Sequence, residues 1–206
     1  ELLAQFQPEA GAMSFTRQQA PLGLGHAVWC ARELVGNEPF ALLLPDVLVK
    51  AGHSCLAQMI EAYNEIDTAA NIVAVEEVAL ERIHMYGVVG VGERKGKAFT
   101  VTQMVEKPPS GSSPSNLIIT GRYILQPEIF DLLATQEHGT GGEIQITDAM
   151  IRLAKTLPFY GLKFEGRTFD CGSKIGFLSA NVAYALARED IAPAFRAEIE
   201  GLLSNK

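Results

Sequence analysis

Hydrophobic and polar positions follow two different patterns that alternate along this chain. Continuous apolar runs such as FALLL (residues 40–44) and NIVAV (71–75) are typical of strands that are buried on both faces of a sheet. Apolar residues at helical spacing over HSCLAQMIEAYNE (53–65) predict an amphipathic helix. The alternation of strands with helices indicates an α/β fold, with a mixed, mostly parallel sheet that is flanked by helices.

Other segments add a hairpin and further elements to this picture. YGVVGVGERKGKAFTVTQMVEK (86–107) predicts a β-hairpin insertion with its turn near Lys95 and Gly96. We expect a helix from Pro127 onward, and another that Thr147 could cap. PFYGLKF (158–164) and RTFD (167–170) predict short strands.

The composition limits the class of protein. The 206 residues suffice for one domain with a sizeable core, so we expect residues 1–206 to form a single domain. A net charge of −7 argues against binding to nucleic acid or to an anionic membrane surface, because both require a basic face. Three scattered cysteines indicate reduced thiols and a cytoplasmic protein, and no apolar run reaches the roughly 18 residues of a membrane span.

Two aspartates follow predicted strands, at the edge where α/β proteins bind ligands. Asp46 ends FALLLPD, and Asp170 ends RTFD before a glycine. Each has an ordinary structural alternative, since Asp46 could cap a helix and Asp170 could simply begin a turn. Two carboxylates at two strand ends could also share one Mg²⁺, whose remaining positions water and phosphate oxygens would fill.

Three residues on the predicted hairpin are candidates for contact with a ligand. Lys107 could meet a phosphate, and Glu106 could accept hydrogen bonds from hydroxyl groups. Neighbours on a strand point to opposite sides, so we expect these two to serve different parts of one ligand. A solvated Glu-Lys pair is the alternative. Gly87 opens the first hairpin strand, where a glycine indicates either a bulge or a ligand close to the backbone.

The segment QQAPLGLGHAVW (18–29) contains a Gly-x-Gly sequence that is close to a dinucleotide-binding fingerprint. Such a fingerprint requires a hydrophobic strand that leads into the glycines, and the preceding residues are polar and include Pro21. The alternative is contact with a base. The Gln18 amide suits the imide edge of uracil or thymine, and Gly23 would let the base lie against the backbone.

Several segments, in this order, resemble bacterial UTP–glucose-1-phosphate uridylyltransferases: RQQAPLGLGHAV, FALLLPDVLV, YGVV, VEKP, GRYIL, GEIQITDA and FDCGS. The resemblance covers nearly the whole chain and implies a Rossmann-like nucleotidyltransferase fold. It implies a reaction in which UTP and glucose 1-phosphate give UDP-glucose and pyrophosphate, with Mg²⁺ as cofactor. It also suggests a homodimer or homotetramer.

The resemblance assigns roles to residues that match the motifs of the family. Gln18 and Gly23 match the uracil contacts, and Asp46 and Asp170 match the Mg²⁺ ligands. Gly87 and Glu106 match the glucose contacts, and Lys107 matches the contact to the sugar phosphate. The resemblance also makes Asp46 and Lys107 the catalytic candidates. Glu143 lies in a family motif, without an assigned role.

One departure from the family pattern is large. Family members begin with a strand and a glycine-rich loop, Gly-x-Gly-Thr-Arg, which holds the triphosphate, and this sequence contains neither. Because ELLAQF (1–6) reads as the end of a helix, we expect an N-terminally truncated chain that could be inactive as it stands. Two alternatives stay open, a related sugar-1-phosphate thymidylyltransferase and a non-catalytic subunit that binds sugar nucleotides.

Overall fold

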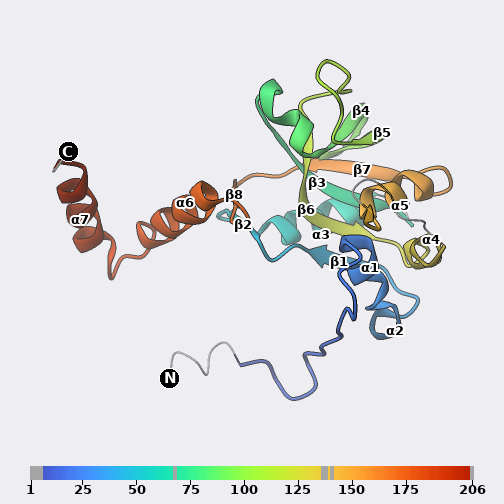
Figure 1. The fold of residues 1–206 in the computed structure, drawn as a ribbon, viewed down its shortest axis with the longest axis horizontal. Coiled ribbons are helices and arrows are strands. Elements are labelled where there is room, and N and C mark those ends of the chain that lie inside the picture. The colour runs from blue at the N-terminus through green and yellow to red at the C-terminus, as the bar shows by residue number, and fades with distance from the viewer. Residues whose placement is uncertain (1–6, 67–68, 136–138, 140–141, 205–206) are drawn as a thin grey trace.

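A computed structural model describes residues 7–66, 69–135, 139 and 142–204, and Figure 1 shows its fold. The six-stranded sheet has the order β1-β6-β3-β7-β5-β4, and β2 and β8 form a separate two-stranded sheet. The strands are β1 (Phe40–Leu43), β2 (Val47–Lys50), β3 (Asn71–Glu77), β4 (Gly87–Lys95), β5 (Ala98–Glu106), β6 (Leu117–Leu125), β7 (Phe159–Lys163) and β8 (Arg167–Asp170). The helices are α1 (Leu24–Trp29), α2 (Arg32–Val35), α3 (Cys55–Glu65), the 3₁₀-helix η2 (Leu80–Met85), α4 (Ile129–Ala134), α5 (Ile146–Leu153), α6 (Lys174–Ala185) and α7 (Ala192–Ser204). The ELLAQF segment lies outside the described residues.

Strand β3 lies at the centre of the core, between two layers of helices. Its alternate side chains enter two different hydrophobic clusters because neighbours on a strand point to opposite faces. Val73 and Val75 pack with residues of α1, α4 and α5, whereas Ile72 and Ala74 pack with residues of α3. The prediction of a strand that is buried on both faces is therefore confirmed for residues 71–75, all of which are buried.

The predicted α/β class, with a mixed sheet between helices, is confirmed, but the prediction that the sheet is mostly parallel is wrong. Among the described strands only β3 and β7 pair in parallel, and the other pairings are antiparallel. Parallel neighbours need a long crossover, usually a helix. The chain supplies α4 and α5 between β6 and β7, whereas β4, β5 and β6 follow one another without a helix between them. Short connections of this kind favour antiparallel pairing.

The segment FALLL does not form a strand that is buried on both faces, as its apolar run predicts. Within the described residues β1 is an edge strand that pairs only with β6. Phe40 and Leu42 are partly buried, but Ala41 and Leu43 are exposed on the other face. An apolar run permits a strand to be buried on both faces. Whether the strand is buried depends on neighbouring elements that lie far away in the sequence.

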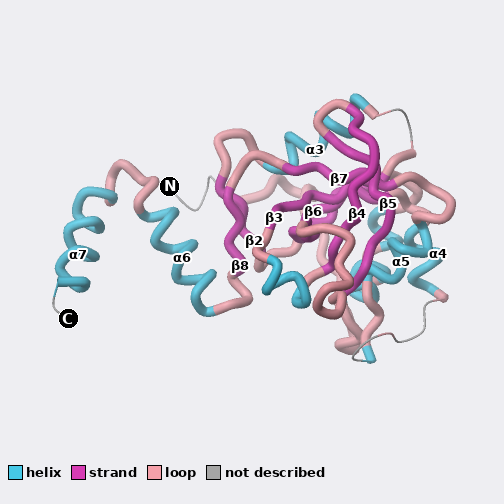
Figure 2. Tube along the Cα trace, turned by 90° about the horizontal axis from the view of Figure 1, so that it is seen from above, coloured by secondary structure: helices cyan, strands magenta, loops and turns pink. Residues whose placement is uncertain are grey.

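Several smaller predictions can also be checked. The hairpin is confirmed, with β4 ending at Lys95 and Gly96 adopting a positive φ in the turn. Thr147 does not cap a helix, because α5 begins at Ile146 and Gln145 is its N-cap residue. In Figure 2, α6 and α7 extend away from the strands towards the C-terminal end. No helix in the described part of the chain has the length and apolar character that a membrane span requires.

Candidate functional site

Gln18 and Gly23 lie together at the start of α1. The Gln18 Nε2 atom donates to the Gly23 carbonyl oxygen at 3.0 Å and lies 2.9 Å from His26 Nδ1. The Gly23 carbonyl also accepts from the Ala27 amide at 3.2 Å, which is the first turn of the helix. The two residues predicted to contact a base are therefore connected directly, and the Gln18 amide is held by its neighbours.

Gly23 must be glycine for reasons that the sequence does not reveal. Its φ of 99° favours glycine, and a Cβ atom there would lie 2.8 Å from Glu143 Cβ and 3.0 Å from the Ile144 backbone. Two backbone hydrogen bonds maintain this approach, from Ile144 to the Leu22 carbonyl at 2.7 Å and from Gly25 to the Ile144 carbonyl at 2.8 Å. Glu143 thereby lies beside Gly23, at the predicted base site.

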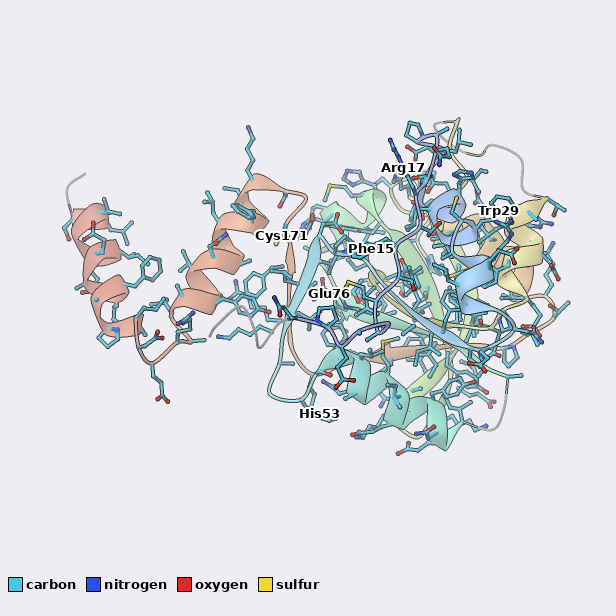
Figure 3. All side chains as sticks on the ribbon, turned by 90° about the horizontal axis from the view of Figure 1, so that it is seen from below. Phe15, Arg17, Trp29, His53, Glu76 and Cys171 are labelled. Atoms are coloured by element: carbon cyan, nitrogen blue, oxygen red, sulfur yellow. The ribbon has the colours of Figure 1, made fainter. Side chains whose placement is uncertain are left out.

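Asp46 and Asp170 lie next to each other because β2 pairs with β8. Val47 lies opposite Asp170 in this pairing, and the Cys171 amide donates to the Asp46 carbonyl oxygen at 2.7 Å. A Cβ atom added at Gly172 would lie 3.1 Å from Asp170 Oδ1 and 3.5 Å from Asp46 Oδ2, so both carboxylates face the backbone of Gly172. Figure 3 labels Cys171 at this junction, where the chain leaves β8 for α6.

The Asp46 turn is held by a side chain that the sequence analysis missed. The Arg122 guanidinium donates to the carbonyl oxygens of Leu44 at 3.0 Å, of Gly121 at 3.2 Å and of Val47. These bonds clamp the residues on both sides of Pro45 and Asp46. The register of β6 shifts against β3 at this point and Gly121 has a φ of 75°, a bulge that turns Arg122 towards the Asp46 turn.

Gly87, Glu106 and Lys107 also lie together. Gly87 is opposite Glu106 in the hairpin, and a Cβ atom at Gly87 would lie 3.0 Å from Glu106 Oε2. Lys107 Nζ lies 3.9 Å from Glu106 Oε1, so the two side chains do not point to opposite sides as expected. The cause is the left-handed conformation of Lys107, with a φ of 46°, which ends the strand alternation. A non-glycine residue in this region is strained, and such strain is concentrated at functional sites.

Two buried residues, for which the sequence analysis gave no site role, connect these groups. The hydroxyl oxygen of Thr147 lies 3.6 Å from the position that a Cβ atom at Gly87 would occupy. Thr147 is also only three residues from Ile144, whose backbone lies against Gly23. Burial raises the pKa of the Tyr123 hydroxyl, and the negative charges of Glu106 and Asp46 add to this effect. Tyr123 is buried on β6 next to Arg122, the residue that holds the Asp46 turn. The sequence signal that could have indicated Tyr123 as a site residue was its position beside Arg122 in the GRYIL segment.

The family model, the relatives and the solved structures that are similar to this chain agree with one another. A family model described as "Nucleotidyl transferase" matches residues 3–186. A UTP–glucose-1-phosphate uridylyltransferase 2 from Staphylococcus saprophyticus is 43% identical over 187 residues, which are 91% of this chain and 64% of the relative. The solved structure of a UDP-glucose pyrophosphorylase complexed with UDP-glucose is similar with a TM-score of 0.80 at 41% identity, over 85% of this chain and 66% of that one.

Two further solved structures are similar to the chain to different degrees. The UTP-bound enzyme from Acinetobacter baumannii gives a TM-score of 0.82 at 39% identity, covering 96% of this chain and 68% of that one. A putative glucose-1-phosphate thymidylyltransferase from Bacillus anthracis gives a TM-score of 0.64 at 22% identity, over 84% of this chain and 63% of that one, and this likeness shows the fold alone. The chain spans just under two thirds of the length of the Staphylococcus relative.

Proposed function

The chain belongs to the nucleotidyl transferase family, and from this premise we propose that the protein forms UDP-glucose and pyrophosphate from UTP and glucose 1-phosphate. The relatives that are 40% identical or more carry names with this activity, which supports the choice of substrates. An oxygen of the sugar phosphate attacks the α-phosphorus of UTP, the new P–O bond forms in line, and pyrophosphate leaves with the electron pair of the broken bond.

The observation that carries the proposal is the convergence of three residue sets. The base set (Gln18 and Gly23) meets the segment that begins at Glu143, and Thr147 of the same segment lies beside Gly87 in the sugar set. Strand β6 connects the sugar set to the metal set, because Ile119 Cδ1 lies 3.6 Å from the Cβ position of Gly87 and Arg122 donates to the carbonyl oxygens of Leu44 and Val47 on either side of Asp46. One extended ligand with a base, a phosphate and a sugar would contact all three sets.

Each set has a distinct part in the reaction. Gln18 orients the uracil ring, which fixes the position of the attached phosphates. Glu106 accepts hydrogen bonds from sugar hydroxyls, and its side chain is only 19% exposed, so water competes weakly for them. Lys107 attracts the sugar phosphate and holds the attacking oxygen close to the α-phosphorus. Catalysis of this kind depends on positioning and charge neutralisation, and it needs no covalent intermediate.

The chemistry of Asp46 and Asp170 suits a magnesium ion, and their position at the paired strands β2 and β8 supports this proposal. Both are exposed carboxylates, and no third acidic, histidine or cysteine side chain joins them among the described residues. Mg²⁺ commonly takes one or two carboxylates and completes its coordination with water and substrate phosphates. When bound, the ion would supply charge neutralisation at the phosphates. Asp170 Oδ1 also accepts from the Gly172 amide at 3.0 Å, which fixes its orientation.

The expected homodimer or homotetramer stays a proposal that the C-terminal helices support. Only Ala180 is buried in α6, whereas Ile175 is 75%, Leu178 59% and Phe177 53% exposed. Apolar side chains on several faces of one helix favour burial in an assembly. The cytoplasmic location also stays a prediction, based on the sparse cysteines. Cys30, Cys55 and Cys171 form no disulfide in the structure.

The decisive assay measures pyrophosphate release by the whole gene product with Mg²⁺. UTP with glucose 1-phosphate should give turnover, and dTTP in place of UTP tests the thymidylyltransferase alternative. Asp46→Asn should lower turnover by at least about a hundredfold, because the charge at the metal site is lost. Binding of UDP-glucose without turnover for any pair of substrates would favour a non-catalytic subunit. Near-normal turnover of Asp46→Asn would remove Asp46 from the metal site.

A further inference from the structure

The orientation of the Gln18 side chain is determined by its two polar neighbours. Its terminal group includes a nitrogen, which only donates, and an oxygen, which only accepts. The Gly23 carbonyl oxygen, 3.0 Å away, can only accept, so the atom facing it is the amide nitrogen. The same nitrogen lies 2.9 Å from His26 Nδ1. Both amide hydrogens are thus directed at protein acceptors.

This arrangement fixes the protonation of His26 as well. Because the Gln18 nitrogen has no lone pair available, His26 Nδ1 must accept, and the ring proton is on Nε2. The imidazole is stacked on Trp29, with ring centroids 6.0 Å apart and an interplanar angle of 24°. The Arg32 guanidinium lies 3.8 Å from the centre of the Trp29 ring. His26 is therefore held on one face by a packed aromatic group.

Only the Oε1 atom of Gln18 stays available to a ligand, and this has a consequence for base selection. An oxygen acceptor pairs with a ring N–H, which uracil has at N3, whereas the N3 atom of cytosine carries a lone pair. We propose that His26 is a positioning residue which locks the Gln18 amide with its oxygen towards the base and so sets the preference for uracil over cytosine. The inference rests on the proposed function, since it takes Gln18 as the base contact.

The test compares the binding of UDP and CDP to the whole gene product by calorimetry. The wild-type protein should prefer UDP. His26→Ala should reduce that preference about tenfold, because the Gln18 amide loses one of two restraints and can rotate. His26→Asn should restore most of the preference, since its side-chain oxygen can accept in place of Nδ1. His53→Ala is the control, because His53 is exposed and pairs with Glu61 instead.

Two outcomes separate the inference from the proposed function. A wild-type protein that prefers UDP, together with an unchanged preference in His26→Ala, overturns the inference alone. A wild-type protein that binds neither nucleotide overturns the proposed function and the inference with it. Nitrogen-15 NMR of the His26 ring adds a readout independent of binding and of the variants. The proton should be on Nε2, and a proton on Nδ1 would overturn the proposed lock.

Discussion

Replacement of Arg122 by methionine tests how the Asp46 turn is stabilised. Methionine retains much of the apolar stem but cannot donate to the carbonyl oxygens of Leu44, Gly121 and Val47. A hydrogen bond to a charged group contributes about 1.5–3 kcal/mol, and a buried acceptor without a partner adds a further cost. The three bonds share one half-buried side chain, so they do not add fully. We expect the free energy of unfolding to fall by about 3 kcal/mol.

Urea denaturation followed by circular dichroism measures this loss. The comparison requires that the m value, the slope of the free energy of unfolding against urea concentration, is the same in the variant and the wild type. Arg152→Met is a matched control, because within the described residues Arg152 donates to one carbonyl oxygen, that of Leu132 at 3.1 Å, and to the Thr135 hydroxyl at 3.3 Å. We expect the control to lose about 1 kcal/mol. Equal losses in the two variants would refute the argument that Arg122 clamps the turn.

Three other predictions concern the sugar site and a buried thiol. Gly87→Ala should weaken UDP-glucose binding at least about tenfold and leave UDP binding unchanged, as calorimetry would measure, because the new Cβ lies 3.0 Å from Glu106 Oε2; equal weakening of both ligands would contradict it. Lys107→Gly should raise the free energy of unfolding by up to about 1 kcal/mol through relief of the positive φ, yet raise the KM for glucose 1-phosphate, and a stability loss would count against the strain. Burial raises the pKa of the Cys55 thiol to about 11, although Arg122 opposes this. The unfolded chain releases this proton near pH 9, so the stability should fall between about pH 9 and pH 11 by about 2–3 kcal/mol, and a Cys55→Ala variant with the same slope would disprove it.

The sequence predicted those parts of the site that depend on where strands end. Asp46 follows β1 and Asp170 is the last residue of β8, and the pairing of β2 with β8 brings the two residues close together. The predicted hairpin carried Gly87 at the start of its first strand and Glu106 near the end of its second, and the structure pairs these two residues directly. Local patterns were sufficient in these cases because the elements that carry the residues are direct partners.

Other parts of the site depend on contacts that no local pattern contains. The Arg122 hydrogen bonds occur next to a bulge at Gly121, in a strand that lies between β1 and β3, and this strand order joins segments that are far apart in the sequence. The left-handed conformation of Lys107 breaks the alternation that the strand pattern predicts. The direction of most strands was predicted wrongly, because helix and strand signals do not determine which strands become neighbours. Base contact by Gln18 and Gly23, metal binding by Asp46 and Asp170, glucose contact by Gly87 and Glu106, and sugar-phosphate contact by Lys107 stay predictions.

The most direct test of the account is a crystal structure of the whole gene product with UDP-glucose and Mg²⁺. We expect uracil N3 to lie against Gln18 Oε1, the glucose hydroxyls against Glu106, and the metal ion between Asp46 and Asp170. A nucleotide sugar bound elsewhere, or bound with its glucose directed away from Glu106, would contradict the account.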